Sequence, residues 1–222
     1  MTDLYPDYET LAANEVKGVD YDVRTYPVKG SKILAIAPHG GGIEPGSSEL
    51  VQGLHERFKF SGYDFDALKS SDNWQLHITS VNFNEPEAIR MNKDMFSSIA
   101  LHGYSGESSN TYVGGLDHEM REIVTTELRN AGFTVSNDPP IGIAGLGATN
   151  IVNRNRRGKG VQLELSTAQR RSFFKDGNIS RSNRINRVQA FYDYVNALGK
   201  AMMKGHRFAP TRMIEHNRIL YK

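Results

Sequence analysis

Apolar residues gather along the chain in short runs that predict buried strands. Residues 33–37 are all apolar, and residues 97–101 end in three apolar side chains. Residues 76–80 and 161–165 alternate apolar with polar side chains, which is typical of half-buried strands. A further short strand is expected at 133–135.

Between these strands, apolar residues recur at helical spacing. The pattern predicts helices over 47–59 and 85–91, a third over 117–131 that stops at Gly132, and a long one over 183–203. The first is expected to begin at a serine with a glutamate in its first turn, as helix N-termini prefer.

The alternation of strands and helices indicates an α/β fold. We expect one domain, residues 1–204, with a mixed, mostly parallel central sheet flanked by helices on both faces. A chain of 222 residues suits a single domain with a substantial core. Residues 205–222 are polar and basic and are expected to be a C-terminal tail, either packed on the body or partly free.

Composition excludes several classes of protein. Hydrophobic content of 38% and charged content of 23% are those of an ordinary globular protein. A formal net charge of +2 gives no global field for nucleic acid or membranes, so neither is expected as a partner. The chain contains no cysteine, which rules out disulfides, thiolate metal sites and a cysteine nucleophile.

The N-terminal residues carry early acids and no apolar core, unlike a secretory signal. No apolar stretch approaches the roughly 20 residues needed to span a bilayer. We therefore expect synthesis in the cytoplasm without a signal peptide, so that any action outside the cell depends on another route of release.

The most informative stretch is the glycine-rich segment from His39 to Glu44, which follows the first predicted strand. A second His-Gly pair begins at His102, after another apolar run. Ligands in α/β folds gather at the carboxyl ends of strands, where both histidines are expected. Two histidines and a glutamate make a zinc site with an open coordination position, as hydrolases require.

Each of these residues also has a simpler interpretation. The histidines could be hydrogen-bonded residues at strand ends, and Glu44 a solvated loop acid. The three glycines could form a phosphate cradle, although no Lys-Ser/Thr follows them as in a P-loop. His77 is the main competing ligand. The four remaining histidines are expected on the surface or at helix caps: His55, His118, His206 and His216.

Glu164 is the other carboxylate of interest. With Gln162 it shares one face of the predicted strand 161–165, opposite the apolar residues. It is either a solvated acid on a surface strand or a general base held near a metal. The basic stretch 154–159 and the pair Arg170-Arg171 are further candidates for chemistry, or solvated loops.

Five motifs in a fixed order resemble the poly-γ-glutamate hydrolase family of Bacillus phages and prophages. They are His39-Gly-Gly-Gly-Ile-Glu44, His102-Gly-Tyr, Tyr112-Val-Gly-Gly-Leu116, Asn150-Ile-Val-Asn-Arg154 and Gly160-Val-Gln-Leu-Glu-Leu-Ser166. The similarity runs from about Tyr5 to Tyr194. It implies a zinc carboxypeptidase-like α/β fold and cleavage of γ-glutamyl amide bonds in the capsule polymer of Bacillus hosts.

The resemblance also implies roles for particular residues. His39, Glu44 and His102 match the zinc ligands of the family, with one Zn²⁺ per chain. Leu163-Glu164-Leu165 resembles the strand that bears the catalytic glutamate of the carboxypeptidases. Four residues separate His39 from Glu44, against two in the carboxypeptidases, which agrees with the phage family and argues against an ordinary exopeptidase.

The mechanism expected from this resemblance uses Glu164 to move the proton of the attacking water to the leaving amine. Arg154 or Arg156 is the candidate cation for the developing oxyanion, and Arg154 is taken as catalytic. Poly-γ-glutamate carries a free carboxylate on every residue, which arginines suit. The substrate-binding candidates are Asn153, Arg156, Arg157, Arg171 and Tyr104.

The chain is expected to act as a monomer on this anionic polymer, outside the cell after host lysis. One alternative is a zinc amidase that cuts γ-glutamyl bonds of cell-wall peptide. An alternative of another class is a non-enzymatic phage protein that binds nucleic acid, which only the basic stretch 154–159 supports.

Overall fold

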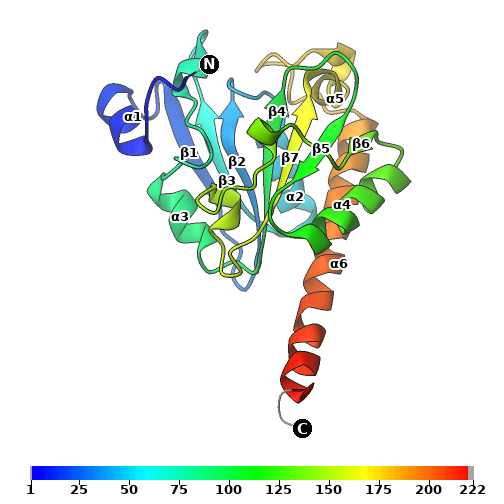
Figure 1. The fold of residues 1–222 in the computed structure, drawn as a ribbon. Coiled ribbons are helices and arrows are strands. Elements are labelled where there is room, and N and C mark those ends of the chain that lie inside the picture. The colour runs from blue at the N-terminus through cyan, green and yellow to red at the C-terminus, as the bar shows by residue number, and fades with distance from the viewer. Residues whose placement is uncertain (1, 220–222) are drawn as a thin grey trace.

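A seven-stranded sheet forms the centre of the computed structural model, which describes residues 2–219 (Figure 1). The strands lie in the order β1-β3-β2-β4-β7-β5-β6. Their bounds are β1 Tyr21–Tyr26, β2 Ile33–Gly41, β3 Ser61–Ala67, β4 Ser97–Tyr104, β5 Thr111–Gly114, β6 Val135–Ser136 and β7 Val161–Ser166. Four neighbouring pairs are parallel, whereas β1 with β3 and β5 with β7 are antiparallel. The predicted mixed, mostly parallel sheet is confirmed.

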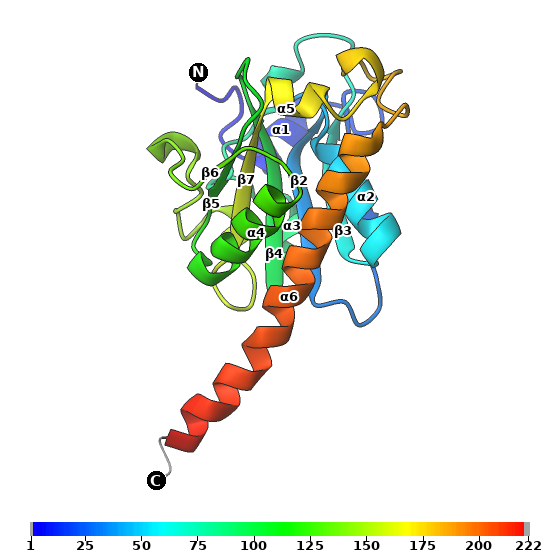
Figure 2. The same ribbon diagram turned by 90° about the vertical axis from the view of Figure 1, so that its right-hand side faces the viewer.

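Helices cover both faces of the sheet. The helices are α1 Tyr8–Asn14, α2 Ser47–Phe58, α3 Pro86–Asn92, α4 His118–Asn130, α5 Thr167–Arg171 and α6 Gln189–Ile219. Single 3₁₀ turns are η1 Asn73–Leu76, η2 Ile141–Ile143, η3 Ile151–Asn153 and η4 Lys175–Gly177. Helices α2, α4 and α6 lie together on one face (Figure 2), and α1, α3 and η3 lie over the other.

Two hydrophobic cores result from this layering. The larger core contains Ile33, Ala35 and Ala37 of β2 together with apolar residues of α2, α4 and α6. The smaller core contains Leu34 and Ile36 of the same strand. Because β2 is buried on both faces, its sequence is a continuous apolar run, as expected for a central parallel strand.

The strands predicted at 33–37, 97–101 and 161–165 are present and extend further than predicted. The prediction of a strand at 76–80 is wrong, because η1 ends at Leu76 and the residues from 77 to 80 pair with no strand. Leu76 and Ile78 are buried in the smaller core, so the alternation reflects a loop packed over the sheet. The strand predicted at 133–135 is reduced to β6.

The helices predicted at 47–59, 85–91 and 117–131 correspond to α2, α3 and α4. The last helix begins six residues later than predicted. Asn183 is part of a turn, where its side-chain amide donates to the carbonyls of Lys175 and Asn178, and the backbone N–H of Val188 donates to Phe173.

Helix α6 runs across the predicted boundary at residue 204 to Ile219. Its C-terminal half extends away from the sheet in both views (Figures 1 and 2). The tail predicted from 205 is therefore helical as far as 219, residues 220–222 lie outside the described part, and the domain boundary itself stays a prediction. Among the described residues, none of the helices has both the length and the apolar character needed to cross a bilayer.

Candidate metal centre

A β-bulge in β2 turns His39 toward the smaller core. Ala37 and the residues two and four before it face the larger core, so regular alternation would place His39 there too. The pairing of β2 with β3 shifts register between Ala37 and Gly40. A bulge inserts one residue and re-aims the side chains beside it. His39 is thereby brought next to His102 of β4, with ring centroids 4.8 Å apart.

The glycines after His39 are required by close packing. A Cβ at Gly40 would overlap the carboxylate of Asp64, and one at Gly41 would overlap that of Asp66. Gly41 also has a φ of +64°, which side chains other than glycine rarely adopt. The glycines are thus explained by close packing against two buried carboxyl groups, and this packing does not need the phosphate-cradle interpretation.

Three side chains converge at the carboxyl ends of β2 and β4. His39 Nδ1 lies 3.1 Å from Glu44 Oε1 and 3.1 Å from His102 Nδ1, and His102 Nδ1 lies 3.4 Å from Glu44 Oε2. Ligands at zinc bond lengths in a tetrahedral site lie about 3.3 Å apart. All three residues are at least nine-tenths buried. These atoms therefore have the spacing of three corners of a tetrahedral zinc site.

Two further observations fit a cation at this point. Glu44 Oε2 is buried with no hydrogen-bond partner, which is costly for a carboxylate. Burial acts to raise the pKa of Glu44, but the neighbouring charges of His39 and His102 outweigh it and hold this pKa well below its usual range. The site thus presents a charged carboxylate and two imidazoles, a donor set that zinc prefers.

The outer nitrogens of both histidines have partners on one segment, His77–Ser80. His39 Nε2 lies 2.8 Å from the carbonyl oxygen of Ile78, and His102 Nε2 lies 3.4 Å from Ser80 Oγ. A ring that donates through Nε2 leaves the lone pair of Nδ1 free for a metal. With Nε2 held in this way, both Nδ1 atoms face Glu44, where their lone pairs would bind a metal placed between the three side chains.

His77 lies beside this centre. Donor atoms of His39, Glu44 and His77 all lie within 4.8 Å of one another, which makes a second possible ligand set. However, His77 Nδ1 is bonded to Asp3 at 2.7 Å, and its ring packs between Trp74 and His39. Burial, with a smaller effect of His39, lowers the pKa of His77 to about 4, so this ring is neutral near pH 7. The shorter distances favour His102 as the third ligand.

Glu164 lies on the adjacent strand to His102. Strand β7 is internal, and Glu164 is only 5% exposed, so the interpretation as a solvated acid on a surface strand is wrong. Gln162 Nε2 donates to Glu164 Oε1 at 2.8 Å, and Asn150 Nδ2 in turn donates to Gln162 Oε1. Burial, followed by the charge of Glu44, raises the pKa of Glu164 well above its usual value.

Arg170 is a buried cation that joins the strand ends around the centre. Its guanidinium donates to the carbonyls of Leu165, Pro45 and Tyr104 at 3.0–3.3 Å, and to Thr167 Oγ1. A Cβ at Gly103 would lie 2.6 Å from this guanidinium, so glycine after His102 makes room for it. The sequence drew attention to Arg170 as one of the arginines suited to bind the carboxylates of the polymer, and it gave no sign of this structural role.

The predicted substrate residues divide between two ends of the sheet. Arg171 is exposed on α5, which follows β7, and Tyr104 ends β4, so both lie at the end that carries the histidines. The backbone N–H of Arg156 and the guanidinium of Arg157 donate to carbonyls of Met95 and Phe96, just before β4 begins. These two arginines therefore lie at the amino ends of the strands, away from the centre.

Among the described contacts, Asn153 and Arg154 have none with the residues of the centre, and their predicted roles stay predictions. Arg154 ends η3 and, within the described structure, has no hydrogen bond or ion pair to either histidine, Glu44 or Glu164. The Asn153 side chain is buried and binds the backbone of Gly145, Gly147 and Gly160. Its contacts are those of a residue that shapes a loop.

The basic stretch 154–159 is partly neutralised within the chain. Arg157 and Lys159 pair with the buried Asp117 at 2.8 and 3.7 Å. This pairing weakens the nucleic-acid alternative, which depended on that stretch alone.

The other histidines with described side chains lie apart from the centre. His55 bonds the Phe60 carbonyl, His118 begins α4, and His206 packs against Phe96. The side chain of His216 lies outside the described part of the structure.

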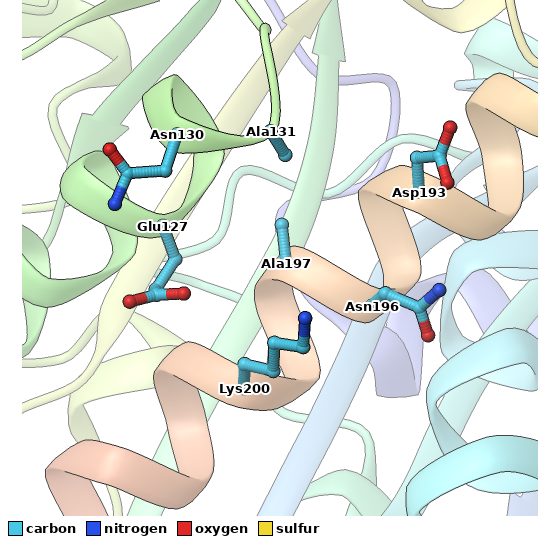
Figure 3. Close-up of a pocket in the computed structure, with 7 residues that line it drawn as sticks. All are labelled: Glu127, Asn130, Ala131, Asp193, Asn196, Ala197 and Lys200. Atoms are coloured by element: carbon cyan, nitrogen blue, oxygen red, sulfur yellow. The ribbon is translucent and has the colours of Figure 1, made fainter.

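A hollow of about 340 Å³ lies between α4 and α6, on the face of the sheet opposite the metal centre (Figure 3). It is lined by Glu127, Asn130, Ala131, Asp193, Asn196, Ala197 and Lys200.

Comparison with known proteins agrees with this geometry. The family model described as poly-γ-glutamate hydrolase matches residues 5–197. The Bacillus subtilis UPF0714 protein YmaC is 41% identical over 203 residues, which cover 91% of this chain and 85% of YmaC. A bacteriophage poly-γ-glutamate hydrolase structure is similar with a TM-score of 0.90 and 38% identity, covering 93% of this chain and 100% of that one. A zinc-free apo structure of YndL is similar with a TM-score of 0.85 and 35% identity, covering 92% of this chain and 99% of that one.

Proposed function

The chain belongs to the poly-γ-glutamate hydrolase family, and we propose that it is a zinc-dependent hydrolase that cuts γ-glutamyl amide bonds of poly-γ-glutamate. The observation that carries this proposal is the convergence of His39 Nδ1, His102 Nδ1 and the Glu44 carboxylate within 3.1–3.4 Å of one another. Three protein ligands leave a fourth position for the reaction, and they suit one zinc ion per chain. The zinc-free state described for YndL supports the choice of metal.

Zinc bound at this site would supply a Lewis acid that polarises the scissile carbonyl and acidifies water. Glu164 then accepts the proton of the attacking water at its carboxylate and returns it to the nitrogen of the leaving amine. Its bond from Gln162 holds the carboxylate in place for both transfers. Glu164 must be ionised for the first transfer; burial and Glu44 oppose that form, and the hydrogen bond from Gln162 and the charges of His39 and Arg170 favour it.

The polymer presents one free carboxylate per residue. Arg171 and Tyr104 are the predicted substrate residues that the fold places at the carboxyl ends of the strands, and we propose that they contact it. Action as a monomer is part of this proposal. Because the substrate is a capsule polymer, the enzyme is proposed to work outside the cell, after lysis of the host.

Metal content and polymer cleavage test the proposal together. The purified protein should contain about one zinc per chain, and it should lower the viscosity of a polyglutamate solution. A chelator should abolish this activity and added zinc should restore it. Release of wall peptides with intact polyglutamate would instead support the cell-wall amidase, and salt-dependent DNA binding without zinc would support the nucleic-acid alternative.

A further inference from the structure

The two ligand histidines are oriented from outside by a single loop segment. Ile78 supplies the carbonyl oxygen opposite His39 Nε2, and Ser80 supplies the hydroxyl opposite His102 Nε2. The backbone N–H of Ile151 donates to the Ser80 carbonyl and fixes one end of this segment. The position of the segment therefore controls which ring nitrogen of each histidine faces Glu44.

The other end of the segment is fixed by Asp3. Its Oδ1 lies 2.7 Å from His77 Nδ1, and its Oδ2 accepts from the backbone N–H of Thr79 at 2.6 Å. The side chains of Asp3 and His77 are both only 13% exposed. One carboxylate thus holds the residues on either side of Ile78, the residue whose carbonyl faces His39.

The ring of His77 also connects Asp3 to His39 by direct packing. The His77 ring packs on Trp74 with centroids 4.3 Å apart and nearly parallel planes, and on His39 with centroids 4.0 Å apart. Because Asp3 fixes the rotation of the His77 ring, it also fixes the surface against which His39 packs.

Asp3 lies ahead of the part of the chain that the family model matches, which begins at residue 5. The next hydrogen bonds of the N-terminal segment serve other purposes: Asp7 caps α1 through Thr10, and Tyr5 donates to Glu15. Asp3 therefore differs from Tyr5 and Asp7 in that its hydrogen bonds go to the segment beside the metal centre.

We propose that Asp3 is a positioning residue of the metal centre, which holds His77–Ser80 so that His39 and His102 present Nδ1 to the metal. This inference rests on the proposed zinc site. Asp3 itself touches neither ligand, and it acts through Ile78 and Ser80. Outer partners of zinc ligands are typically worth about 10- to 100-fold in metal affinity, so loss of a residue one step further out should cost about 10-fold.

The test compares Asp3→Ala and Asp3→Asn with Asp7→Ala. Asp7 also accepts a backbone hydrogen bond near the N-terminus, but none of its hydrogen bonds in the described part of the chain reaches the 77–80 segment. The first measurement is the rate at which a chromogenic chelator takes zinc from each protein. We expect Asp3→Ala to lose zinc about 10-fold faster than the wild type, Asp3→Asn to be intermediate, and Asp7→Ala to match the wild type.

The second measurement needs no metal. Nitrogen-15 NMR of the metal-free protein reports which ring nitrogen of His39 and His102 carries the proton. The wild type should show a proton on Nε2 of both rings, whatever Nδ1 carries beside Glu44, and Asp3→Ala should lose this Nε2 proton in part. Unchanged Nε2 protonation and unchanged zinc loss in Asp3→Ala, or equal effects in Asp7→Ala, would overturn the inference. A wild type that holds no zinc overturns the proposed function instead, and the NMR result still decides whether Asp3 orders the rings.

Discussion

His102 and Glu164 are register partners on the adjacent parallel strands β4 and β7. The preceding pair, Leu101 with Leu163, lies in the larger core, so His102 and Glu164 leave the opposite face of the sheet together. A candidate ligand and a candidate base are thus placed side by side by backbone pairing. Because both lie on central strands, their relative position depends little on loop conformation.

Glu164→Gln should bind zinc as the wild type does and lose hydrolysis by at least about 100-fold, the usual contribution of a general base. The amide is nearly the same size and still fits beside Gln162, but it accepts no proton. Metal content and initial rates of polymer cleavage check this. Glu107→Gln changes an exposed carboxylate in the loop between β4 and β5 and should keep full activity. Full activity in Glu164→Gln would remove Glu164 from the proton-transfer role.

The choice between His102 and His77 as third ligand can be made by substitution. His102→Ala removes an atom 3.1 Å from His39 Nδ1 and should reduce bound zinc to the background level. His77→Ala should still bind one zinc per chain, since His77 Nδ1 is already bonded to Asp3. Metal analysis after dialysis separates the two, and the reverse pattern would establish the His39, Glu44 and His77 set.

Much of the fold could be predicted because the central strands are buried on both faces and read as apolar runs. Strand β3 could not be predicted from the sequence. It buries Asp64 and Asp66, and aspartates in a sequence are typical of surface residues. Their burial depends on Arg24 of β1, which pairs with both at 2.7 and 3.0 Å. That partner is 40 residues distant from Asp64 along the chain, so no local pattern reveals it.

The candidate site divides in the same way. His39, Glu44, His102 and Glu164 stand at strand ends within recognisable motifs, and the structure brings the first three together. The residues that hold the candidate ligands from outside carry no recognisable motif, because they are defined by hydrogen bonds between residues far apart in the sequence. Asp3 and His77, for example, are 74 residues apart. The sequence did not show that Arg156 and Arg157 lie at the amino end of β7, and the roles predicted for the arginines at 154–157 stay predictions.

Gly41→Ala should destabilise the protein more than Gly132→Ala does. Both glycines have positive φ, +64° and +89°, so both substitutions carry a backbone cost of roughly 1–2 kcal/mol. Gly132 has open space around it, whereas a Cβ at Gly41 would overlap Asp66 and the backbone of Ala67. The additional overpacking should cost about 1–3 kcal/mol more. Urea unfolding of both variants measures the difference, and equal losses would contradict it.

The buried Asp64 predicts a specific pH dependence of stability. Burial, opposed in part by Arg24, raises the pKa of Asp64 from 3.8 to about 7 in the folded protein. Between these values the folded state keeps a proton that the unfolded state has released. Raising the pH from about 4 to about 7 therefore lowers the free energy of unfolding, by up to about 1.4 kcal/mol per pH unit.

Asp64→Asn removes this titration. The free energy of unfolding of the wild type minus that of Asp64→Asn should fall from pH 4 to pH 7 and stay constant above. Denaturant unfolding at a series of pH values gives this difference. Asp94→Asn, at an exposed position, should follow the wild type throughout. A difference that does not change with pH would show that Asp64 titrates alike in both states.

Arg170→Lys should destabilise the protein by about 3 kcal/mol, the scale of breaking a buried charged network. The planar guanidinium reaches three carbonyls and a hydroxyl at once, and a lysine ammonium cannot span the same acceptors. Arg171→Lys, on the exposed neighbour, should change stability by less than about 0.5 kcal/mol. Gly103→Ala should also destabilise the protein, by less than Arg170→Lys does, because the added Cβ displaces the same guanidinium. Thermal unfolding of the three variants checks the order, and a stable Arg170→Lys would show that the strand ends hold together without this cation.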